Sequence, residues 1–357
     1  MKYVLHFGLF VLLTSGALSA DRSSVALSTS HDIWDRTSAF PGGYVYSITQ
    51  TGDGYLWLAT SKGLVRYDGL TFAFIPTGDS ARATNVPATG MVTDSDGQIW
   101  ATDDHTHLFR YERGLLRGPL PDNGKHRYLP SSLNKTFDGS MLFASELQGL
   151  IEYRHGERRV LLEPRLLPIS PTAVAQTEDG TFWIGTREQG LFRFTPRNDS
   201  QEPQKVLDLP NVRINCLISI ENATLLIGTN DGLFVLQNDE LQREAYPELH
   251  HQEILALGAG QRGEIWIGTA AHVFRAQAND VDAEDSAGPL EQLRVNGPVT
   301  ALFEDRDGNL WIGEPDTIER YRENSFVSYL SSAGLPCLNC GAIYVDPHYS
   351  VWFAPWD

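Results

Sequence analysis

Short apolar runs alternate with glycine-containing polar turns along most of the chain. In the clearest copy of this pattern, the run Val45–Gln50 precedes Asp53-Gly54, and the run Leu56–Thr60 precedes Gly63-Leu64. Apolar runs joined by Asp-Gly predict antiparallel hairpins, because glycine tolerates the positive φ that such turns require. A third run follows the Gly-Leu pair, and a fourth, residues 72–75, follows a further Asp-Gly turn. The pattern therefore predicts a four-stranded antiparallel meander.

The meander recurs with a period of about 42 residues. The units align on a bulky anchor in the second predicted strand, which is a tryptophan in most copies. In order, the anchors are Trp57, Trp100, Phe143, Trp183, Leu226, Trp266, Trp311 and Trp352. Units of this length with four strands are typical of β-propeller blades, in which the anchor packs between neighbouring sheets. The Gly or Ala that precedes a threonine after most anchors is expected to let adjacent backbones approach closely.

The repeat predicts an all-β fold, a β-propeller of seven four-stranded blades within residues 21–330. Residues 331–357 are then the first strands of a further blade or second propeller. A ring of eight blades is the alternative, in which the N-terminus completes the last unit. His31–Arg36 is predicted to be a lone strand that precedes the first meander. Because an open ring exposes unpaired strand edges, we expect this segment to join the last blade as its outer strand.

Residues 1–20 have the pattern of a secretory signal peptide. Lys2 precedes the mostly apolar stretch Tyr3–Leu13, and small residues then lead to a cleavage point after Ser19 or Ala20. The apolar stretch is too short to span a bilayer, although an uncleaved anchor is the alternative interpretation. The sequence therefore predicts a periplasmic or extracytoplasmic protein, with a parent protein attached to the inner membrane.

Acidic residues outnumber basic ones by 45 to 28, which gives a net charge of −17. This excess argues against binding to nucleic acid or to anionic lipid. Cys337 and Cys340 form a Cys-x-x-Cys pair, for which a local disulfide is expected in an oxidising compartment. A zinc site would need four ligands, and His348 is the one further candidate near the two cysteines, so zinc is not expected here. Cys216 stands in an apolar run and is predicted to be a small buried hydrophobic residue.

The repeats resemble the two-component regulator propeller family over residues 31–357. The most specific stretch is Gln50–Phe72, which is similar to the family's opening blade almost residue for residue. Trp34 and Pro41-Gly42-Gly43 stand where the family has its entry segment, and Gly334-Leu335-Pro336 resembles its linker between blades. Members are extracytoplasmic sensors. They typically carry two seven-bladed propellers, a small β-sandwich, a membrane helix and a cytoplasmic histidine kinase or diguanylate cyclase.

The resemblance implies the ligand-sensing region of a two-component or cyclic-dinucleotide signalling protein, itself non-catalytic and without a cofactor. The sequence ends at Asp357 within the eighth unit, so we expect a fragment whose membrane segment and output domain lie elsewhere in the parent. The parent could act as a homodimer. Two alternatives stay open at this point. One is a propeller enzyme, a lyase or lactonase with a metal or His/Glu centre on the channel, and the other is a protein-interaction platform.

The turns after the second and fourth strands of each blade should share one rim of the ring, where loops carry function on a rigid scaffold. Basic side chains, carboxylates and histidines are mixed there, which suits a small polar ligand such as a saccharide. Tyr44 or Tyr128 would provide a stacking face. The candidate ligand-binding residues are Tyr44, Lys62, His105, His107, Arg127, Tyr128, Arg187, Arg213, His250 and His272.

The sequence points to neither a metal site nor a catalytic centre. Asp103, Asp104, His105 and His107 form the densest group of metal-capable residues, but one local cluster on a loop is usually solvated. The sequence has no serine elbow, His-Glu-x-x-His motif or glycine-rich phosphate loop. We therefore predict no metal ligand and no catalytic residue.

Overall fold

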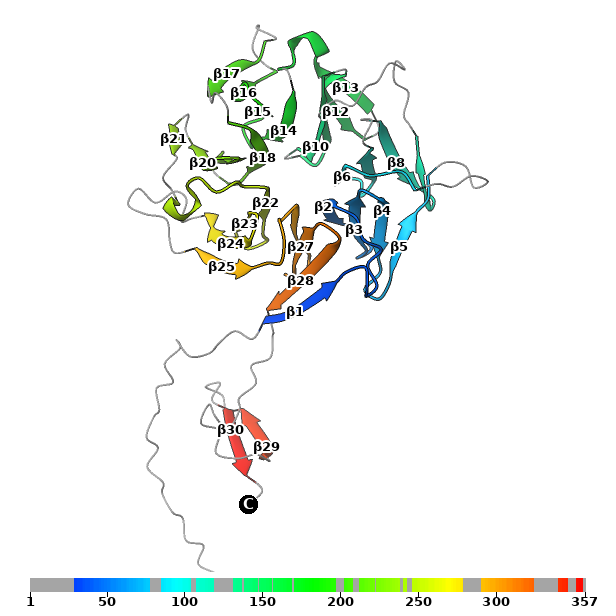
Figure 1. Cartoon of the computed structure of the whole chain (residues 1–357), viewed down its shortest axis with the longest axis vertical. Coiled ribbons are helices and arrows are strands. Elements are labelled where there is room, and N and C mark those ends of the chain that lie inside the picture. The colour runs from blue at the N-terminus through cyan, green and yellow to red at the C-terminus, as the bar shows by residue number, and fades with distance from the viewer. Residues whose placement is uncertain are drawn as a thin grey trace, which may run out of the picture. The chain divides into compact units, whose positions relative to one another are not determined.

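The computed structural model describes residues 29–77, 85–103, 107–118, 131–136, 138–146, 148–155, 157–168, 170–196, 202–207, 212–221, 223–237, 240–242, 246–278, 290–323, 340–345 and 351–355. The chain divides into two units, of which the larger is His31–Arg322. This unit is a ring of seven four-stranded antiparallel sheets (Figure 1). The predicted all-β, seven-bladed propeller is confirmed, and the alternative of eight blades is wrong.

Each blade begins at the central channel and adds its strands outward. From the inner to the outer strand, they are β2 (Val45–Gln50), β3 (Leu56–Thr60), β4 (Gly63–Tyr67) and β5 (Phe72–Ile75) in blade 1; β6 (Gly90–Thr93), β7 (Ile99–Thr102), β8 (Leu108–Glu112) and β9 (Leu115–Arg117) in blade 2; β10 (Ser131–Lys135), β11 (Met141–Ser145), β12 (Gly149–Arg154) and β13 (Glu157–Leu162) in blade 3; β14 (Pro171–Gln176), β15 (Phe182–Thr186), β16 (Leu191–Phe194) and β17 (Gln204–Leu207) in blade 4; β18 (Ile214–Ser219), β19 (Leu225–Thr229), β20 (Gly232–Gln237) and β21 (Glu240–Gln242) in blade 5; β22 (Ala256–Ala259), β23 (Glu264–Gly268), β24 (His272–Gln277) and β25 (Glu291–Arg294) in blade 6; and β26 (Ala301–Glu304), β27 (Leu310–Glu314), β28 (Thr317–Glu323) and β1 (Thr29–Trp34) in blade 7. Two short 3-10 helices, η2 (Pro164–Leu166) and η3 (Pro247–Leu249), lie in connections.

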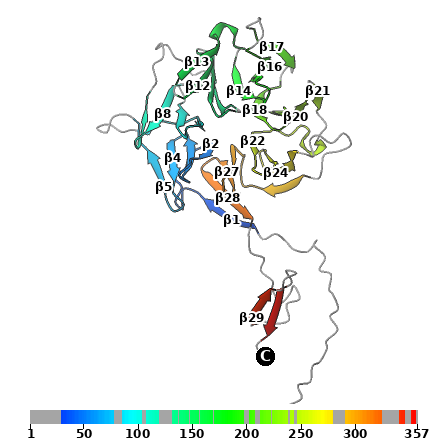
Figure 2. The ribbon, with the colours of Figure 1, turned by 180° about the vertical axis from the view of Figure 1, so that it is seen from behind.

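The N-terminal strand closes the ring. β1 pairs with β28 as the outer strand of blade 7, as predicted for this segment (Figures 1 and 2). Asp32 accepts hydrogen bonds from the Arg320 guanidinium, at 2.7 and 3.1 Å. The Trp34 ring stacks on Trp311 with centroids 5.6 Å apart. Residues nearly 300 positions apart in sequence therefore complete one sheet, which leaves no gap between blades 7 and 1.

The anchor side chains fill the spaces between blades. Trp57, for example, is 2% exposed and packs among residues of blade 2 such as Met91 and Ile99. One anchor assignment is wrong by one residue. Leu142, not Phe143, takes the tryptophan position of blade 3, because it pairs with β10 and faces blade 4, whereas Phe143 faces blade 2. The error arose because both residues are bulky and the periodicity alone tolerates a shift of one.

Small residues two positions after the anchor allow the blades to approach, as predicted; Gly268 precedes Thr269, whereas Gly313 precedes Glu314. A Cβ atom added at Gly268 would lie 2.4 Å from a Val299 methyl group of the next blade. A Cβ added at Gly313 would lie 2.7 Å from a methyl group of Val45 in blade 1. Both distances are shorter than any ordinary carbon–carbon contact. Glycine at these positions is therefore required by packing between blades rather than by turn geometry.

The second unit contains a C-terminal hairpin of β29 (Cys340–Val345) and β30 (Val351–Pro355). Its register matches that of β2 and β3 in blade 1. Trp352 pairs with Tyr344 as Trp57 pairs with Thr49, and both pairs of strands shift register at the residue after the first. The hairpin thus has the register of the inner half of a blade.

Several predictions concern residues outside the part of the chain that the structure describes. These are the signal peptide at residues 1–20, the Cys337 half of the expected disulfide, and the linker Gly334-Leu335-Pro336. Within the described residues, no helix has the length and apolar character needed to cross a membrane.

Candidate functional site

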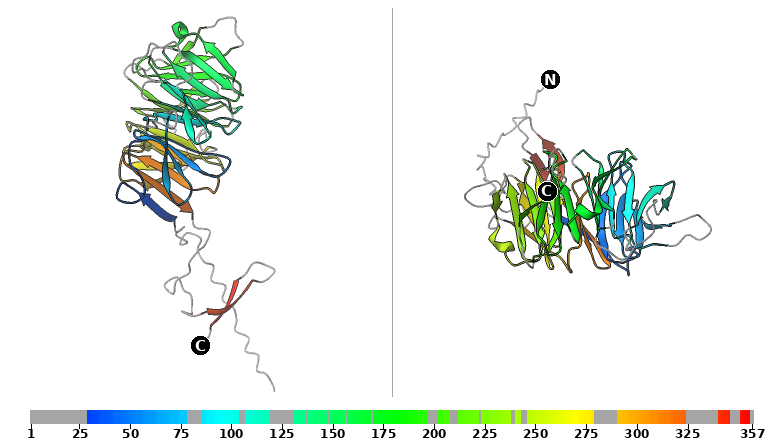
Figure 3. Two further views of the ribbon diagram at one scale, coloured as in Figure 1. Left: turned by 90° about the vertical axis from the view of Figure 1, so that its right-hand side faces the viewer. Right: turned by 90° about the horizontal axis from the view of Figure 1, so that it is seen from above.

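The turns after the second strands meet the segments that lead into the first strands, as expected for one shared rim. Ser61 N donates to Tyr44 O at 3.0 Å in blade 1, and Asn230 N donates to Arg213 O at 3.1 Å in blade 5. The strands run between this rim and the opposite one (Figure 3). The Asp-Gly turns join the first and second strands of a blade, as between β2 and β3, so they lie on the opposite rim. We call the first of these the entry rim, because every blade begins its inner strand there.

The central channel holds a cavity of about 470 Å³ lined by the inner strands. Its polar lining comes from hydroxyl and amide groups, among them Thr89, Thr172, Asn215 and Thr300. None of the described residues that line it carries a carboxylate, an imidazole or a basic group. The channel wall therefore offers uncharged hydrogen-bonding groups.

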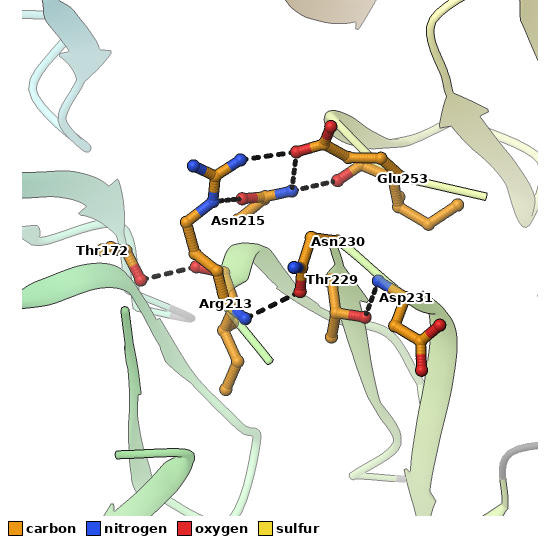
Figure 4. A network of polar contacts seen from close by, with 9 residues as sticks. Thr172, Arg213, Asn215, Thr229, Asn230, Asp231 and Glu253 are labelled. Carbon is orange, nitrogen blue, oxygen red and sulfur yellow. Dashed lines mark hydrogen bonds and ion pairs between the residues drawn. The ribbon is translucent and has the colours of Figure 1, made fainter. Parts of the chain in front are cut away.

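At the mouth of the channel, an arginine, an amide and a carboxylate from blades 5 and 6 form one network (Figure 4). The Arg213 guanidinium donates to Asn215 Oδ1 at 2.7 Å and to Glu253 Oε1 at 2.5 Å. Asn215 Nδ2 donates to Glu253 Oε1 at 3.3 Å. Side chains of Arg213 and Glu253 are 43% and 39% exposed, so the network is accessible from solvent. Its geometry is fixed by three mutual contacts rather than by burial.

Asn215 is held in place by the backbone of the next blade. It occupies a register shift in β18, and the same position in other blades is Thr172 or Thr300. Each of these side chains donates to a carbonyl group at the start of the following blade. The bonds are Thr172 Oγ1 to Ile214 O, Asn215 Nδ2 to Ile254 O, and Thr300 Oγ1 to Val45 O. The amide of Asn215 therefore joins two blades while its oxygen orients Arg213.

An aromatic pair, Tyr44 and Tyr46, lies on the same rim in blade 1. Their ring centroids are 4.7 Å apart, and the residues are 40% and 39% exposed. Burial of the hydroxyl raises the pKa of Tyr44, and the charge of Glu253 adds to the effect. Tyr46 and Asn215 both line the cavity, which links the aromatic pair to the polar network.

The other predicted ligand residues are spread around the entry rim. Lys62 is exposed, and its ammonium group donates to Pro41 O at 2.9 Å. Arg187 is exposed in the turn after β15. His250 follows η3, and His272 begins β24 with its ring 5.9 Å from that of Phe274. These residues lie on blade 1, on blade 4, in the connection from blade 5 to blade 6, and on blade 6. His105, Arg127 and Tyr128 lie outside the described residues.

Two residues with potential metal-binding or nucleophilic chemistry, His107 and Cys216, have surroundings that the structure describes. His107 Nδ1 lies 2.8 Å from Asp103 Oδ2, within a single turn. In the described part of the chain, no group of three or more potential ligands is placed to hold a metal ion. Cys216 lies in the channel wall, and burial raises the pKa of its thiol to about 12. The thiol therefore stays protonated and unreactive at neutral pH.

Sequence reasoning missed three residues of this site, namely Tyr46, Asn215 and Glu253. One position in the repeat is shared by Tyr44, Arg213 and Glu253. Each precedes the apolar residue that leads into an inner strand, namely Val45, Ile214 and Ile254. Tyr46 and Asn215 share the position two residues later, at the register shift. Aligning the blades on their entry residues instead of on tryptophan would have brought these positions together.

The fold and the rim define a seven-bladed propeller with a polar, partly aromatic mouth. Residues 39–62 and 293–314 match the model of the two component regulator propeller. These two segments, one at the start and one near the end of the ring, are therefore similar to the repeats of that family, as the sequence resemblance indicated. No curated protein matches the chain.

Solved structures with the same fold include extracellular domains of two component systems and a lyase. The chain is similar to the extracellular domains of two proteins from B. thetaiotaomicron described as hybrid two component systems, BT4673 and BT3049. The TM-scores are 0.64 and 0.67 at 18% identity, with 91% and 90% of this chain and 44% and 46% of those chains covered. It is also similar to virginiamycin B lyase from Staphylococcus aureus, with a TM-score of 0.60 at 16% identity and coverage of 82% and 99%. The chain thus spans less than half the length of the two extracellular domains.

Proposed function

We propose that this chain is the ligand-sensing propeller region of an extracytoplasmic two-component or cyclic-dinucleotide signalling protein. The ligand is a small polar molecule such as a saccharide, bound at the mouth of the channel on the entry rim. The region is non-catalytic and transmits binding to a membrane-linked output domain of the parent protein, which acts alone or as a homodimer. The observation that carries this proposal is that the network of Arg213, Asn215 and Glu253 and the pair of Tyr44 and Tyr46 meet one cavity, which Asn215 and Tyr46 both line.

The chemistry of the mouth suits a saccharide. Exposed tyrosine rings stack on the apolar faces of sugar rings, while amide, guanidinium and carboxylate groups form hydrogen bonds with ring hydroxyls. Arg213 and Glu253 each keep exposed atoms while they hold each other in position. Such a preorganised pair loses little side-chain entropy when a ligand binds.

A lyase or lactonase of similar fold would need a metal or a His/Glu centre on the channel. The described lining of the channel consists of hydroxyl, amide and apolar groups, which favours binding over catalysis. The matched repeats at residues 39–62 and 293–314, together with the similarity to extracellular domains of two component systems, support a sensor. Assays of lyase and lactonase activity, with metal analysis of the same preparation, test the enzymatic alternative directly.

The test is a thermal shift measurement of the purified chain against a panel of neutral and acidic oligosaccharides and small polar metabolites. A ligand at one hundred times its dissociation constant should stabilise the fold by about 2.7 kcal/mol, which raises Tm by several degrees. Arg213→Ala and Tyr44→Ala should each abolish most of that rise. Turnover of any panel member would overturn the non-catalytic assignment.

The matched control is Arg193→Ala. Arg193 lies on β16 away from the entry rim, where it contacts Gln204. This variant should keep the full thermal shift, because it removes an arginine without touching the channel mouth. If Arg193→Ala loses the shift as strongly as Arg213→Ala does, the ligand binds elsewhere and the proposed site is wrong.

A further inference from the structure

Blade 7 has a buried carboxylate where every other blade has an apolar side chain. Glu319 on β28 pairs with Ile312, the residue after the anchor Trp311. The corresponding partners in blades 1 to 6 are Val65, Phe109, Ile151, Phe192, Phe234 and Phe274. The side chain of Glu319 is completely buried. A buried charge is costly unless it is paired and hydrogen-bonded, so its surroundings need an explanation.

A second buried carboxylate, Glu314, lies close by and ends β27. Glu314 Oε1 accepts from the backbone N–H groups of Asn296 and Gly297, at 3.1 and 3.0 Å. Glu319 Oε1 accepts from Asn296 Nδ2 at 3.0 Å. Its other oxygen, Oε2, lies 2.9 Å from His31 Nε2 on β1. The two carboxylates therefore share the loop at Asn296, and the closing strand supplies the imidazole that covers them.

Two like charges in a buried space favour the proton-bound form of one of them. Burial, and next the charge of Glu319, raise the pKa of Glu314 above its usual value. Burial and the same carboxylate raise the pKa of Tyr321 to about 12, so this hydroxyl stays protonated. The His31 ring stacks on Tyr321 with centroids 4.0 Å apart. Burial of the pair thus favours a proton on Glu314.

Other charged groups nearby point away from the cluster. On β1 and β28, Asp32 and Arg320 contact each other on the face toward blade 1. On blade 6, Val273 and Leu293 pack toward blade 7. Side chains alternate along a strand, so the neighbouring pair, His272 and Arg294, points to the opposite face. Among the described residues, the titratable groups that face the pair are then His31 and Tyr321.

We propose that Glu314, Glu319 and His31 form a proton-binding latch between blades 6 and 7, which fastens β1 to the ring. With a proton on Glu314, the buried space holds a single carboxylate charge, and Glu319 keeps its hydrogen bonds to Asn296 and His31. As the pH rises, Glu314 loses this proton and two charged carboxylates share the buried space. The docking of β1 therefore weakens at alkaline pH, and acidification strengthens it.

The sign follows from proton linkage. In the folded state, burial and next the charge of Glu319 raise the pKa of Glu314, and they outweigh the charge of His31, which lowers it. Detachment of β1 would open the buried pair to water and remove part of that burial, so the folded state binds more protons than the state with β1 detached. Stability from this group is fully present below its unfolded pKa and is lost as the pH rises through the folded one. For one linked proton, the equilibrium constant for detachment rises up to tenfold for each pH unit within that window.

Hydrogen exchange of the full chain, measured by mass spectrometry from about pH 5 to 8, tests the latch. Exchange of the β1 amides is expressed relative to that of β17, the outer strand of blade 4. This ratio cancels the intrinsic pH dependence of exchange. The ratio should rise with pH, by up to tenfold per unit over the linked window. A ratio that is constant across the series would overturn the proposal without any variant.

Glu314→Gln and Glu319→Gln sharpen the test, since each leaves only one carboxylate in the buried space. Either variant should flatten the pH dependence of the ratio. If the cluster merely filled space, both would lower protection equally at every pH and leave the slope unchanged, which would also contradict the latch. The matched control is Glu152→Gln in blade 3, a buried acid 8% exposed, which should keep the wild-type slope.

Discussion

The two faces of blade 7 are closed by the same strand but by different chemistry. Toward blade 1, Trp34 of β1 stacks on Trp311, and the Arg320 guanidinium lies 5.1 and 5.2 Å from the centroids of these two rings. Toward blade 6, His31, three residues before Trp34 on β1, contacts the buried Glu319. Alternation along one strand thus presents an aromatic surface to one side and a titratable group to the other. The comparison separates permanent closure from adjustable closure.

The face toward blade 1 has further polar links at both rims. At the entry rim, Asp316 accepts from Gly43 N and from the Arg36 guanidinium, both at 2.6 Å. At the opposite rim, the Arg306 guanidinium donates to Thr51 O and Gly52 O of blade 1. These groups are largely exposed, so each adds little alone. Blade 7 therefore contacts blade 1 or the closing strand at the entry rim, between the rims through the aromatic stack, and at the opposite rim.

The largest effect in this comparison is expected from Trp311→Ala. Trp311 is 2% exposed, stacks on Trp34 and donates from its indole N–H to Asp305 at 2.7 Å. Its loss should lower the free energy of unfolding by about 3–5 kcal/mol, measured by denaturant titration. A loss below about 1 kcal/mol would mean that the aromatic stack does not hold the ring closed.

A smaller effect is expected at the glycines that face each seam. Gly313→Ala crowds Val45, and Gly268→Ala crowds Val299. Each substitution should cost about 1–3 kcal/mol in thermal or denaturant unfolding, because an added methyl group must displace a packed neighbour. Shortening the neighbour, as in Val299→Ala with Gly268→Ala, should recover part of the loss. If the double variant is no better than the sum of the two singles, direct crowding is not the cause.

The smallest effect is expected for Asp316→Asn, and its pH dependence should be opposite to that of the latch. The hydrogen bond from Gly43 N, and next the Arg36 pair, lower the pKa of Asp316. Stability from this carboxylate is present above its unfolded pKa and is lost as the pH falls through the folded one. The variant should therefore be less stable than the wild type by about 0.2–1 kcal/mol at pH 7.

The difference should shrink as the pH falls through the lowered pKa of Asp316, because the protonated carboxyl group and the amide are both uncharged. Denaturant titrations of the two proteins at neutral and acidic pH measure it. A difference that grew on acidification would remove the contrast between the two faces of blade 7.

The repeat made most of the fold predictable, because each blade restates the same constraints. In each copy of the repeat, an Asp-Gly turn, a buried anchor and a small residue after the anchor together predict one blade. The unpaired segment before Val45 predicts that the N-terminal strand closes the ring. The misplaced anchor at Phe143 shows the limit of that reasoning. Periodicity fixes a unit to within a residue, whereas the choice between Leu142 and Phe143 depends on which face each presents to a neighbour.

The site was only partly predictable, because it is assembled across blades. Arg213 was expected on the entry rim, but its partners Asn215 and Glu253 are identified by contacts that only the ring creates. Glu319 was missed for the opposite reason. Its position is apolar in the other blades, so the repeat itself marks it as an exception once the strands are aligned in register.

The pairing of β1 with β28 also governs the order in which the protein can be built. His31 is among the first residues of the ring to leave the ribosome, but its partner Glu319 is synthesised 288 residues later. Until then the outer edge of blade 7 does not exist, and the apolar face of blade 1 around Val45 and Leu58 has no neighbour to cover it. Contacts of such large sequence separation form slowly. The nascent ring therefore exposes aggregation-prone surface for almost its whole synthesis, a period in which chaperones would have the most to protect.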